Sequence, residues 1–492
     1  MVAIMMSEHE KIDDIPSVKR LLGRFGHLVS ALGVEGLLSA LFFVYLAWLD
    51  VAAYGEVMYA VAVGSVVSTV VKFGLYYPLV GELGKAGKEK APGIINRVNI
   101  IKVSLLVPAI ITVWGLAAFR GFSSQMAWIL FFVSLGFALE GLADTFFSDL
   151  RVRGRQDREA RIKVASTVLG YGYGFVSAVL GLHPVLISLF MPVSGLVQLT
   201  LGAGSYVRVY RTNLFMRPQW RAVWHLFRIA LVFAMIENLG TFYNKTNIFF
   251  LESAVGVKGV AFYSATWNVV DSVARLASVQ FLGWVIFPLL STLWWKNRER
   301  LGPFVRANAL WLLTIAFPIM FFLHWESDFL IGIIYPGEYK DAVWMQRYLI
   351  WTVPFTFVHN LFAYVMMIVG AANRLLAFAV LGTLLNLLYN VVLVKSYGLA
   401  GGCLVIILTK LTMTILTFSY CQIRFSLFKV SDFLFPFGLA GVSLALFLMI
   451  WPLITIHPAV AVTLSFYVLI LWRLGTRFLG EPPRRKVSKE GG

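Results

Sequence analysis

Residues 223–295 read VWHLFRIALVFAMIENLGTFYNKTNIFFLESAVGVKGVAFYSATWNVVDSVARLASVQFLGWVIFPLLSTLWW. The stretch is apolar enough for two membrane-spanning helices, yet each half carries a run of polar residues at helical spacing. The runs are Glu237, Asn238, Thr241, Asn244 and Lys245, and then Ser264, Asn268, Asp271, Arg275 and Ser278. Intervals of three and four place the second run on one helix face. Because a charge at mid-helix costs about 2.5–3.5 kcal/mol on insertion scales, the two polar faces predict a water-filled path for a polar substrate.

Composition extends this interpretation to the whole chain. Of the 492 residues, 59% are hydrophobic and 14% are charged, whereas charged residues make up about a quarter of an ordinary soluble protein. The apolar residues fall in long blocks separated by short charged connections, as membrane-spanning helices require. The sequence therefore predicts an all-α polytopic membrane protein.

Fourteen transmembrane helices are expected, each long enough to cross about 30 Å at about 1.5 Å per residue. The predicted spans are 24–48, 52–80, 94–119, 124–149, 161–182, 184–209, 223–250, 258–294, 303–325, 341–369, 374–395, 399–423, 432–455 and 458–479. The eighth is longer than one crossing needs, which indicates either a bend or an extension into the cytoplasm.

The basic residues predict the orientation. Most of the 42 Lys and Arg residues lie in connections that are internal if the N-terminus is cytoplasmic. The connection after the second span, for example, is assigned Lys85, Lys88, Lys90, Arg97 and Lys102. The outer connections hold only Arg120, Lys258, Lys340, Arg347 and Lys395. By the positive-inside rule, we expect a multi-pass protein of the plasma (cytoplasmic) membrane with both termini in the cytoplasm.

Several classes of function are disfavoured. The positive-inside pattern accounts for the net charge of +17 without a nucleic acid partner. No connection is large enough for a soluble catalytic domain, and no phosphate-binding GxxxxGK[ST] loop occurs. Cys403 and Cys421 share one predicted span, and the histidines lack metal-ligand spacing. The first 20 residues lack the apolar core of a signal peptide. We expect a protein that is not an enzyme and has no catalytic residue, metal or cleaved leader.

An internal repeat predicts the domain organisation. Tyr54 precedes Pro78 by 24 residues in the second span, and Tyr263 precedes Pro288 by 25 in the eighth. Two six-helix bundles related by a parallel repeat are therefore expected, with two further C-terminal helices. The expected divisions are a cytoplasmic segment 1–23, an N-lobe 24–210, a basic cytoplasmic linker 211–222, a C-lobe 223–425, the last two spans 426–480 and a cytoplasmic tail 481–492.

Charged and amide residues within the spans define a candidate substrate cavity. Its residues are Glu35, Glu237, Asn238, Asn244, Lys245, Asn268, Asp271, Arg275 and Lys410. Arg275 and Lys410 have the chemistry to hold an anionic group such as a lipid diphosphate. In an alternative interpretation, Asp271 and Arg275 neutralise each other at i and i+4 as a buried structural pair.

Glu140 and Asp144 lie one helical turn apart in the fourth span. Two carboxylates on one helix face have the chemistry to bind Na⁺ or to carry a proton. They are equally suited to pairing with Lys72 or to lining the cytoplasmic mouth. Na⁺ or H⁺ is the only cofactor-like species that the sequence suggests.

Several short motifs resemble the polysaccharide-repeat (O-antigen type) flippases of the multidrug/oligosaccharidyl-lipid/polysaccharide exporter superfamily. The motifs are Tyr54-Gly55, Phe73-Gly74-Leu75, Val80-Gly81-Glu82-Leu83, Ile334-Tyr335-Pro336-Gly337-Glu338-Tyr339, Asn386, Asn390 and Tyr397-Gly398. The resemblance covers essentially all the spans. It implies a two-lobed transporter that moves a polyprenyl-phosphate- or diphosphate-linked oligosaccharide to the outer leaflet by alternating access. The implied partners are that substrate, the bilayer and proteins of glycan assembly.

Three alternatives remain. A multidrug antiporter of the same superfamily, coupled to a cation or a proton, would call for a net acidic cavity. A membrane-embedded enzyme of glycan assembly would need an acid/base or nucleophile constellation. In a scaffold protein without transport, the charged faces would be packed salt bridges.

Overall fold

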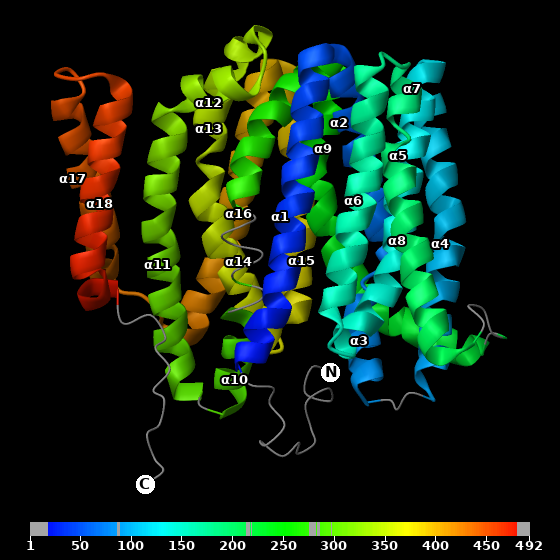
Figure 1. Cartoon of the computed structure of the whole chain (residues 1–492). Helices are drawn as coiled ribbons and strands as arrows, with labels where there is room; N and C mark the ends of the chain where they lie inside the picture. Colours follow the sequence, from blue (N-terminus) through cyan, green and yellow to red (C-terminus); the bar gives the residue numbers. More distant parts are fainter. Residues whose placement is uncertain are drawn as a thin grey trace. The chain divides into compact units, whose positions relative to one another are not determined.

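The computed structural model describes residues 18–85, 89–212, 217, 219–274, 282, 286–296 and 298–479. Within these ranges the chain is helical and has no β-strand (Figure 1). The chain divides into two compact units, Met1–Phe262 and Tyr263–Gly492. The expected domain boundary at 211–222 stays a prediction.

The first unit contains eight complete helices and most of a ninth. They are α1 (Val18–Leu49), α2 (Val51–Lys72), α3 (Tyr76–Lys85), α4 (Ala91–Phe119), α5 (Ser124–Val152), α6 (Gln156–Val179), α7 (Pro184–Ile187), α8 (Phe190–Tyr210) and the part of α9 (Trp220–Ala274) up to Phe262. Two of the connecting turns are short because a side chain caps the following helix. Asp50 accepts the amide of Ala52 at 2.7 Å, and Ser123 accepts that of Met126 at 3.2 Å.

The second unit contains the rest of α9 and the C-terminal helices. They are α10 (Phe287–Lys296), α11 (Arg298–Trp325), α12 (Ser327–Ile334), η4 (Gly337–Ala342), α13 (Val343–Leu349), α14 (Thr352–Ile368), α15 (Ala372–Tyr389), η5 (Asn390–Val394), α16 (Lys395–Phe425), η6 (Val430–Phe433), α17 (Leu434–Ile450) and α18 (Ile456–Leu479). The Tyr335 and Tyr339 rings of the resemblance motif stack at 5.0 Å, and both residues are buried. This motif therefore serves the packing of the second unit.

The described helices confirm the predicted multi-spanning, all-α fold. By length and composition, 9 of them are able to cross a membrane, and the bent pair Gly337–Leu349 and Thr352–Ile368 adds a tenth. The 55-residue α9 and the 54-residue run Ala372–Phe425 are interrupted at Gly256 and Gly398. The first covers the seventh predicted span and the start of the eighth, and the second covers the eleventh and twelfth. Helices α1 and α6 coincide with the first and fifth predicted spans.

The predicted second span is wrong in its extent. Helix α2 ends at Lys72, and the chain turns through Phe73 and Gly74, which have φ angles of 50° and 59°. A Cβ atom at Gly74 would meet the backbone of Ala234 in α9. The chain therefore leaves the helical path where the backbone of α9 packs directly against it, and α3 begins two residues after Gly74.

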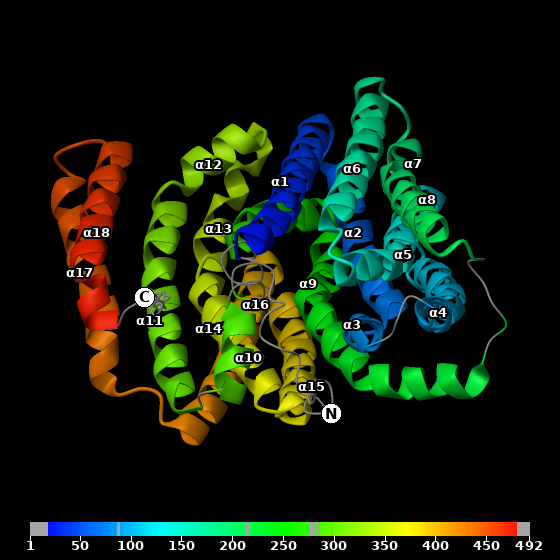
Figure 2. The same cartoon turned by 60° about the horizontal axis from the view of Figure 1, so that its bottom comes forward.

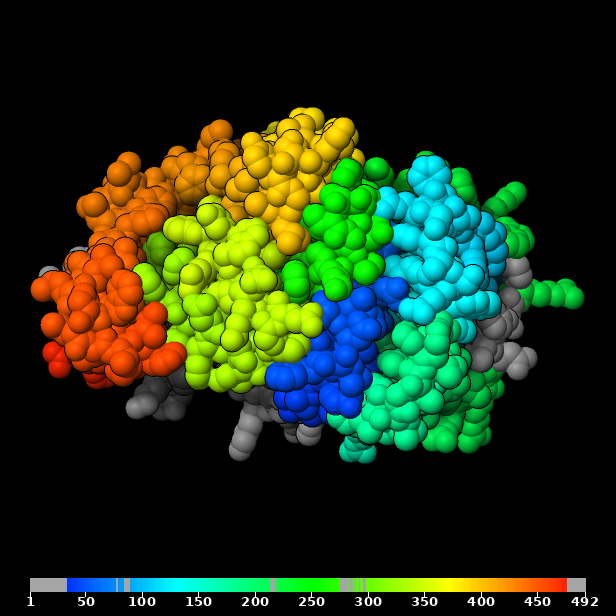
Figure 3. Space-filling view, turned by 90° about the horizontal axis from the view of Figure 1, so that it is seen from above, coloured from blue at the N-terminus to red at the C-terminus, as the bar shows by residue number. Residues whose placement is uncertain are grey.

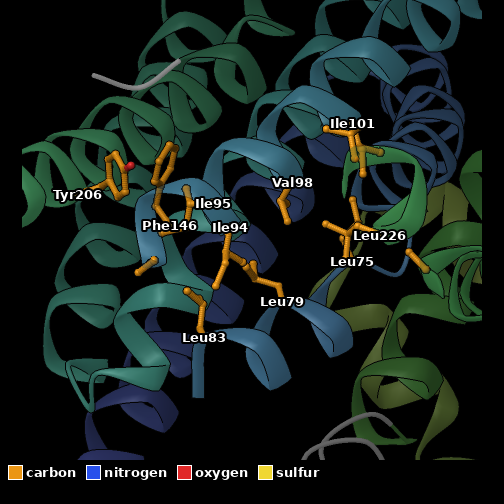
Figure 4. Packing of buried hydrophobic residues seen from close by; sticks show 13 residues of the cluster. Leu75, Leu79, Leu83, Ile94, Ile95, Val98, Ile101, Phe146, Tyr206 and Leu226 are labelled. Atoms are coloured by element: carbon orange, nitrogen blue, oxygen red, sulfur yellow. The ribbon is translucent and has the colours of Figure 1, made fainter. Parts of the chain in front are cut away.

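Apolar packing joins α3, α4 and the start of α9. Figure 4 shows Leu75, Ile101 and Leu226 grouped together, each at most 4% exposed. Ile94 and Leu79 extend the same cluster along α3 and α4. Burying a side chain of this size stabilises the fold by about 1.5–3 kcal/mol, so these contacts fix the first turns of α9 to α4.

Two polar contacts tie the helices together at the end of the first unit seen in Figure 3, where the blue α1–α2 turn adjoins the cyan α4–α5 turn. Gln125 Nε2 donates to Glu56 Oε2 at 2.8 Å, which links α5 to α2. Arg120, in the turn between α4 and α5, forms an ion pair with Glu252 of α9. Glu56 is thus half-buried and hydrogen-bonded.

Candidate functional site

Charged side chains from four helices gather inside the first unit. This charge cluster consists of Lys72 on α2, Lys102 on α4, Glu140 and Asp144 on α5, and Glu237 on α9. Lys72 is the common neighbour, because it lies within electrostatic range of all four other members. The structure thus brings together three of the carboxylates that the sequence singled out and adds two lysines.

Lys102 is the most deeply buried member, at 2% exposed. Its Nζ donates to the carbonyl of Gly141 at 2.8 Å and lies 4.0 Å from Asp144 Oδ2. The assignment of Lys102 to an inner connection is therefore wrong. Helix α4 begins at Ala91, so Lys102 is three turns inside it, where α5 supplies a carbonyl and a carboxylate.

Asp144 is held by two cations. Besides Lys102, Arg151 Nη1 lies 3.5 Å from Asp144 Oδ1. Arg151 also donates to both oxygens of the fully buried Glu159, at 2.8 and 2.6 Å, and Lys163 Nζ lies 3.1 Å from the same carboxylate. A continuous chain of ion pairs therefore runs from Lys102 to Lys163. Removing one partner of such a network would leave an uncompensated buried charge.

Glu140 has a different environment, although it lies only one turn from Asp144. Gln198 Nε2 of α8 donates to Glu140 Oε1 at 2.9 Å, and the Ser194 hydroxyl lies 3.5 Å from the same oxygen. Within the described ranges, no Lys or Arg nitrogen comes within 4 Å of it, while Glu35 of α1 and Lys72 are electrostatic neighbours. In the described part of the chain, Glu140 thus has amide and hydroxyl partners and no cation in contact.

The polar face of the seventh predicted span meets α2. The Thr69 hydroxyl donates to that of Thr241 at 3.2 Å, and Asn238 Nδ2 donates to the carbonyl of Ala234 at 2.8 Å. Glu237 lies beside this contact, half-buried, within range of Lys72 and Lys102. In the part of the chain that the structure describes, neither Lys72 nor Glu237 forms an ion pair within 4 Å. Both charges are therefore held in the helices without a direct counter-charge among the described residues.

Asn244 and Lys245 lie two turns beyond Glu237 on α9, and both are half-buried. Asn244 Nδ2 donates to the carbonyl of Gly240 at 2.7 Å, while its Oδ1 atom is buried without a hydrogen-bond partner among the described residues. An acceptor in this state is a candidate contact for a hydroxyl-bearing substrate.

The remaining candidates belong to the second unit. Asn268 and Asp271 lie on the last turns of α9. Lys410 of α16 is 8% exposed, next to the buried His359 of α14, which contacts the Thr417 hydroxyl at 3.3 Å. Arg275 lies outside the described residues, so its pairing with Asp271 stays a prediction.

Lys72 and Lys102 are the charged residues that the candidate cavity omitted. Lys72 was predicted within the second span but only as a partner for Glu140 or Asp144, and Lys102 follows Asn96 and Asn99, which gives the start of α4 the polarity of a connection. The predicted third span, 94–119, already contained Lys102, but the residue was counted with the charges of the adjoining connection and was therefore left out of the candidate cavity. Among the described residues, no group of three or more His, Cys, Asp or Glu side chains is arranged to hold a metal ion.

Known proteins resemble the chain both in sequence and in fold. The probable low-salt glycan biosynthesis flippase Agl15 of Haloferax volcanii is 22% identical over 290 residues, which cover 59% of this chain and 60% of the relative. The chain thus matches about three fifths of the length of that curated relative.

Two solved structures have the same fold. An inward-facing multidrug resistance MATE family transporter of the MOP superfamily matches with a TM-score of 0.63 at 17% sequence identity. The match covers 80% of this chain and 94% of the transporter chain. The lipid II flippase MurJ in an inward closed conformation also has a TM-score of 0.63, at 14% identity, covering 90% of this chain and 98% of its own.

A family model places the chain more specifically. The model described as polysaccharide biosynthesis protein matches residues 46–344, which is more than half of the sequence. That range contains the whole charge cluster and all of α9. The chain therefore belongs to the polysaccharide biosynthesis protein family.

Proposed function

We propose that the protein is a flippase that moves a polyprenyl-phosphate- or diphosphate-linked oligosaccharide from the cytoplasmic to the outer leaflet. It works by alternating access in the cytoplasmic membrane, with both termini in the cytoplasm, and it catalyses no covalent reaction. Membership of the polysaccharide biosynthesis family supports this proposal, as does the likeness to Agl15, which is itself described as a probable flippase. Proteins of glycan assembly are the expected partners.

The observation that carries the proposal is the position of Lys72. It lies within electrostatic range of every other member of the charge cluster, yet among the described residues no carboxylate reaches within 4 Å of it. Lys102 already donates to a backbone carbonyl and adjoins Asp144. Lys72 is therefore the lysine of the cluster that is open to a phosphate oxygen, and Lys binds phosphate as a compact point charge.

The other predicted cavity residues are proposed to contact the sugars and the phosphate of the same substrate. Amides and carboxylates such as Asn238, Asn244 and Glu237 suit the hydroxyl groups of sugars. In the second unit, Lys410 and Arg275 are proposed as further cations for the phosphate, and Asn268 and Asp271 as polar contacts for the glycan. The apolar polyprenyl chain would remain in the bilayer, where it costs nothing to solvate.

Glu140 is the candidate site of ion coupling. Its contacts are an amide and a hydroxyl, and no cation among the described residues touches it, so its charge is available to H⁺ or Na⁺. Asp144, the other carboxylate proposed from the sequence, is already matched by Lys102 and Arg151. We therefore assign coupling to Glu140 and a structural role to Asp144.

A multidrug antiporter coupled to a cation or proton is the second candidate. The three carboxylates of the charge cluster outnumber its two lysines, which favours a cationic substrate. The membrane-embedded enzyme is less well supported, because the cluster presents ion pairs and hydrogen-bonded carboxylates and no nucleophile activated by a neighbouring base.

Transport by the purified full-length protein distinguishes these functions. The protein is reconstituted into vesicles that contain a labelled polyprenyl-diphosphate oligosaccharide, and exposure of the label to an impermeant reagent is followed over time. The flippase predicts label movement that depends on the protein, with no drug-cation efflux under an imposed H⁺ or Na⁺ gradient. Cation efflux without movement of the labelled lipid would establish the antiporter instead.

A further inference from the structure

The connection between α8 and α9 and the first turns of α9 carry basic residues without acidic ones. Between Arg161 and Ile236 the sequence contains no Asp or Glu. The basic side chains of α8, the connection and early α9 are Arg208, Arg211, Arg217, Arg221 and Arg228. Each is exposed, and within the described ranges none forms an ion pair within 4 Å. The described part of this surface therefore presents a cluster of positive charge to its surroundings.

Two indole rings stand on the same helix face as these arginines. Trp220, Trp224 and Arg228 follow one another at intervals of four, with Arg221 beside them, so they share one side of α9. Trp220 is 66% exposed and Trp224 60%. Figure 2 shows these first turns of α9, in green, running across the view before the helix curves toward its label. Exposed Trp and Arg on one helix face are typical of a segment at the membrane–water interface.

A cavity opens between these rings and α4. Its volume is about 160 Å³, and its lining residues are Ile100, Ile101, Ser104, Leu105, Trp220, Val223, Trp224 and Phe227. Ser104 is the one lining residue with a polar side chain apart from the two indoles. The neighbouring face of α4 carries Val107 and Ile111, which are 60% and 65% exposed, as expected for a surface that faces acyl chains.

The cavity wall is rigidly held. Phe227 stacks on Phe73 at 4.6 Å and on Trp224 at 5.4 Å, with interplanar angles of 18° and 10°. On the opposite helix face, Leu226 is 1% exposed in the core that joins α3, α4 and α9. The stack fixes the Trp224 ring as one side of a preformed apolar slot, which lowers the entropic cost of binding a flexible chain.

We propose that this surface is a binding site for an anionic phospholipid of the surrounding bilayer. An acyl chain occupies the cavity between α4 and α9, and the headgroup phosphate lies against Arg221 and Arg228. Charge complementarity selects this occupant, because the surface offers only positive charge above an apolar slot. A zwitterionic phospholipid would fill the slot but would leave the arginines without a net counter-charge.

The proposal is tested on the full-length protein in nanodiscs of phosphatidylcholine doped with phosphatidylglycerol that carries brominated acyl chains. Bromine quenches the fluorescence of indoles that it touches, so enrichment of the anionic lipid at Trp220 and Trp224 lowers the emission. The expected result is stronger quenching by brominated phosphatidylglycerol than by brominated phosphatidylcholine. Removing charge in Arg221→Gln/Arg228→Gln should weaken that preference by about five-fold for each arginine.

Two further variants separate the slot from the charges. Ser104→Phe fills the cavity and should abolish the preferential quenching while the protein keeps its melting temperature. Arg97→Gln, which removes an arginine of α4 that pairs with Glu82 and does not line the slot, should leave the quenching unchanged. Equal quenching by the two lipids, or an unchanged preference in the double arginine variant, would overturn the proposal.

A competition experiment identifies the source of the phosphate. Unlabelled polyprenyl phosphate at equal mole fraction should leave the quenching by brominated phosphatidylglycerol intact. Complete loss of the quenching by brominated phosphatidylglycerol would assign the slot to the polyprenyl chain and would refute the phospholipid assignment. No oligosaccharide is present, so failure here is independent of the proposed transport activity.

Discussion

Gly55, in the second turn of α2, lies directly against the backbone carbonyl of Val257, one residue beyond the interruption of α9 at Gly256. A Cβ atom at position 55 would overlap that carbonyl, so the absence of a side chain allows the two backbones to meet. The Arg120–Glu252 ion pair and the edge-to-face contact of Tyr59 with Phe249 join α9 to the same end of the unit. The interruption of α9 is thus held by contacts from α2 and from the α4–α5 turn.

Gly55→Ala should destabilise the protein, since the new methyl group forces the two backbones apart. Overpacking of this kind costs about 1–3 kcal/mol. Gly115→Ala is the matched control, because a Cβ atom there meets nothing within 4 Å and alanine stabilises a helix interior by about 0.5–1 kcal/mol. Thermal unfolding in detergent should show a lower midpoint for the first variant and an equal or higher midpoint for the second. Equal midpoints for both would contradict the close packing.

The same glycine shows how far the sequence alone could go. Hydropathy sufficed to predict the number of spans, because each crossing needs a long apolar block whatever its neighbours are. The Tyr54-Gly55 motif indicated the family but not its physical role. Its contact with Val257 joins residues about 200 positions apart, and no local pattern encodes that contact.

Burial of charge was equally hard to predict, since it depends on neighbouring helices. Lys102 appears polar and peripheral in the sequence, but the Gly141 carbonyl and Asp144 of α5 make its burial possible. Glu140 and Asp144 have the same spacing and chemistry in the sequence, and only Gln198 and Arg151 distinguish them. The sequence predicted which carboxylates are candidates. Only the fold shows that Asp144 forms ion pairs whereas Glu140 is hydrogen-bonded to neutral groups.

Lys72→Gln should lower the initial rate of lipid-linked oligosaccharide movement at least ten-fold, because a charge-assisted hydrogen bond to phosphate contributes about 1.5–3 kcal/mol. Lys72→Arg keeps the charge and should retain most of the activity. Lys258→Gln, at an exposed position of α9, is the control and should transport normally. The rates are measured in vesicles with equal amounts of inserted protein. A fully active Lys72→Gln variant would remove this lysine from the substrate site.

Arg275→Ala and Lys410→Ala are also expected to slow translocation, since both cations are proposed to contact the phosphate. Each variant should insert in normal amounts and bind the unphosphorylated polyprenol as well as the parent protein does. A defect with the diphosphate-linked substrate alone would support direct contact. Normal transport by both variants would defeat the assignment.

The two carboxylates of α5 should respond differently to neutralisation. Glu140→Gln keeps a hydrogen-bonding group opposite Gln198 and should remove the dependence of transport on H⁺ or Na⁺ with little change in thermal stability. Asp144→Asn leaves Lys102 and Arg151 without their shared carboxylate, so it should lower stability by several kcal/mol. Transport is measured over a range of pH and Na⁺ concentration, alongside the unfolding midpoint. If transport by the Glu140→Gln variant depends on H⁺ and Na⁺ as before, Glu140 has no role in ion coupling and serves only packing.

The Arg120–Glu252 ion pair should contribute to stability more than an exposed pair does. The Arg120 side chain is 27% exposed and that of Glu252 13%, whereas those of Arg155 and Asp157 are 44% and 33% exposed. Arg120→Ala and Glu252→Ala should each cost about 1–2 kcal/mol, between the values for exposed and buried pairs, and Arg155→Ala less than about 0.5 kcal/mol.

A double-mutant cycle isolates the coupling between Arg120 and Glu252. If loss of the ion pair causes the destabilisation, the double alanine variant should have nearly the same free energy of unfolding as either single variant. The second substitution then removes a charge that has already lost its partner. The exchanged variant Arg120→Glu/Glu252→Arg should recover part of the stability, since it restores opposite charges across the same two positions. Additive losses in the double variant would show that the two residues act separately, and the contacts of Gly55 and Tyr59 would then have to contribute more to holding this end of α9.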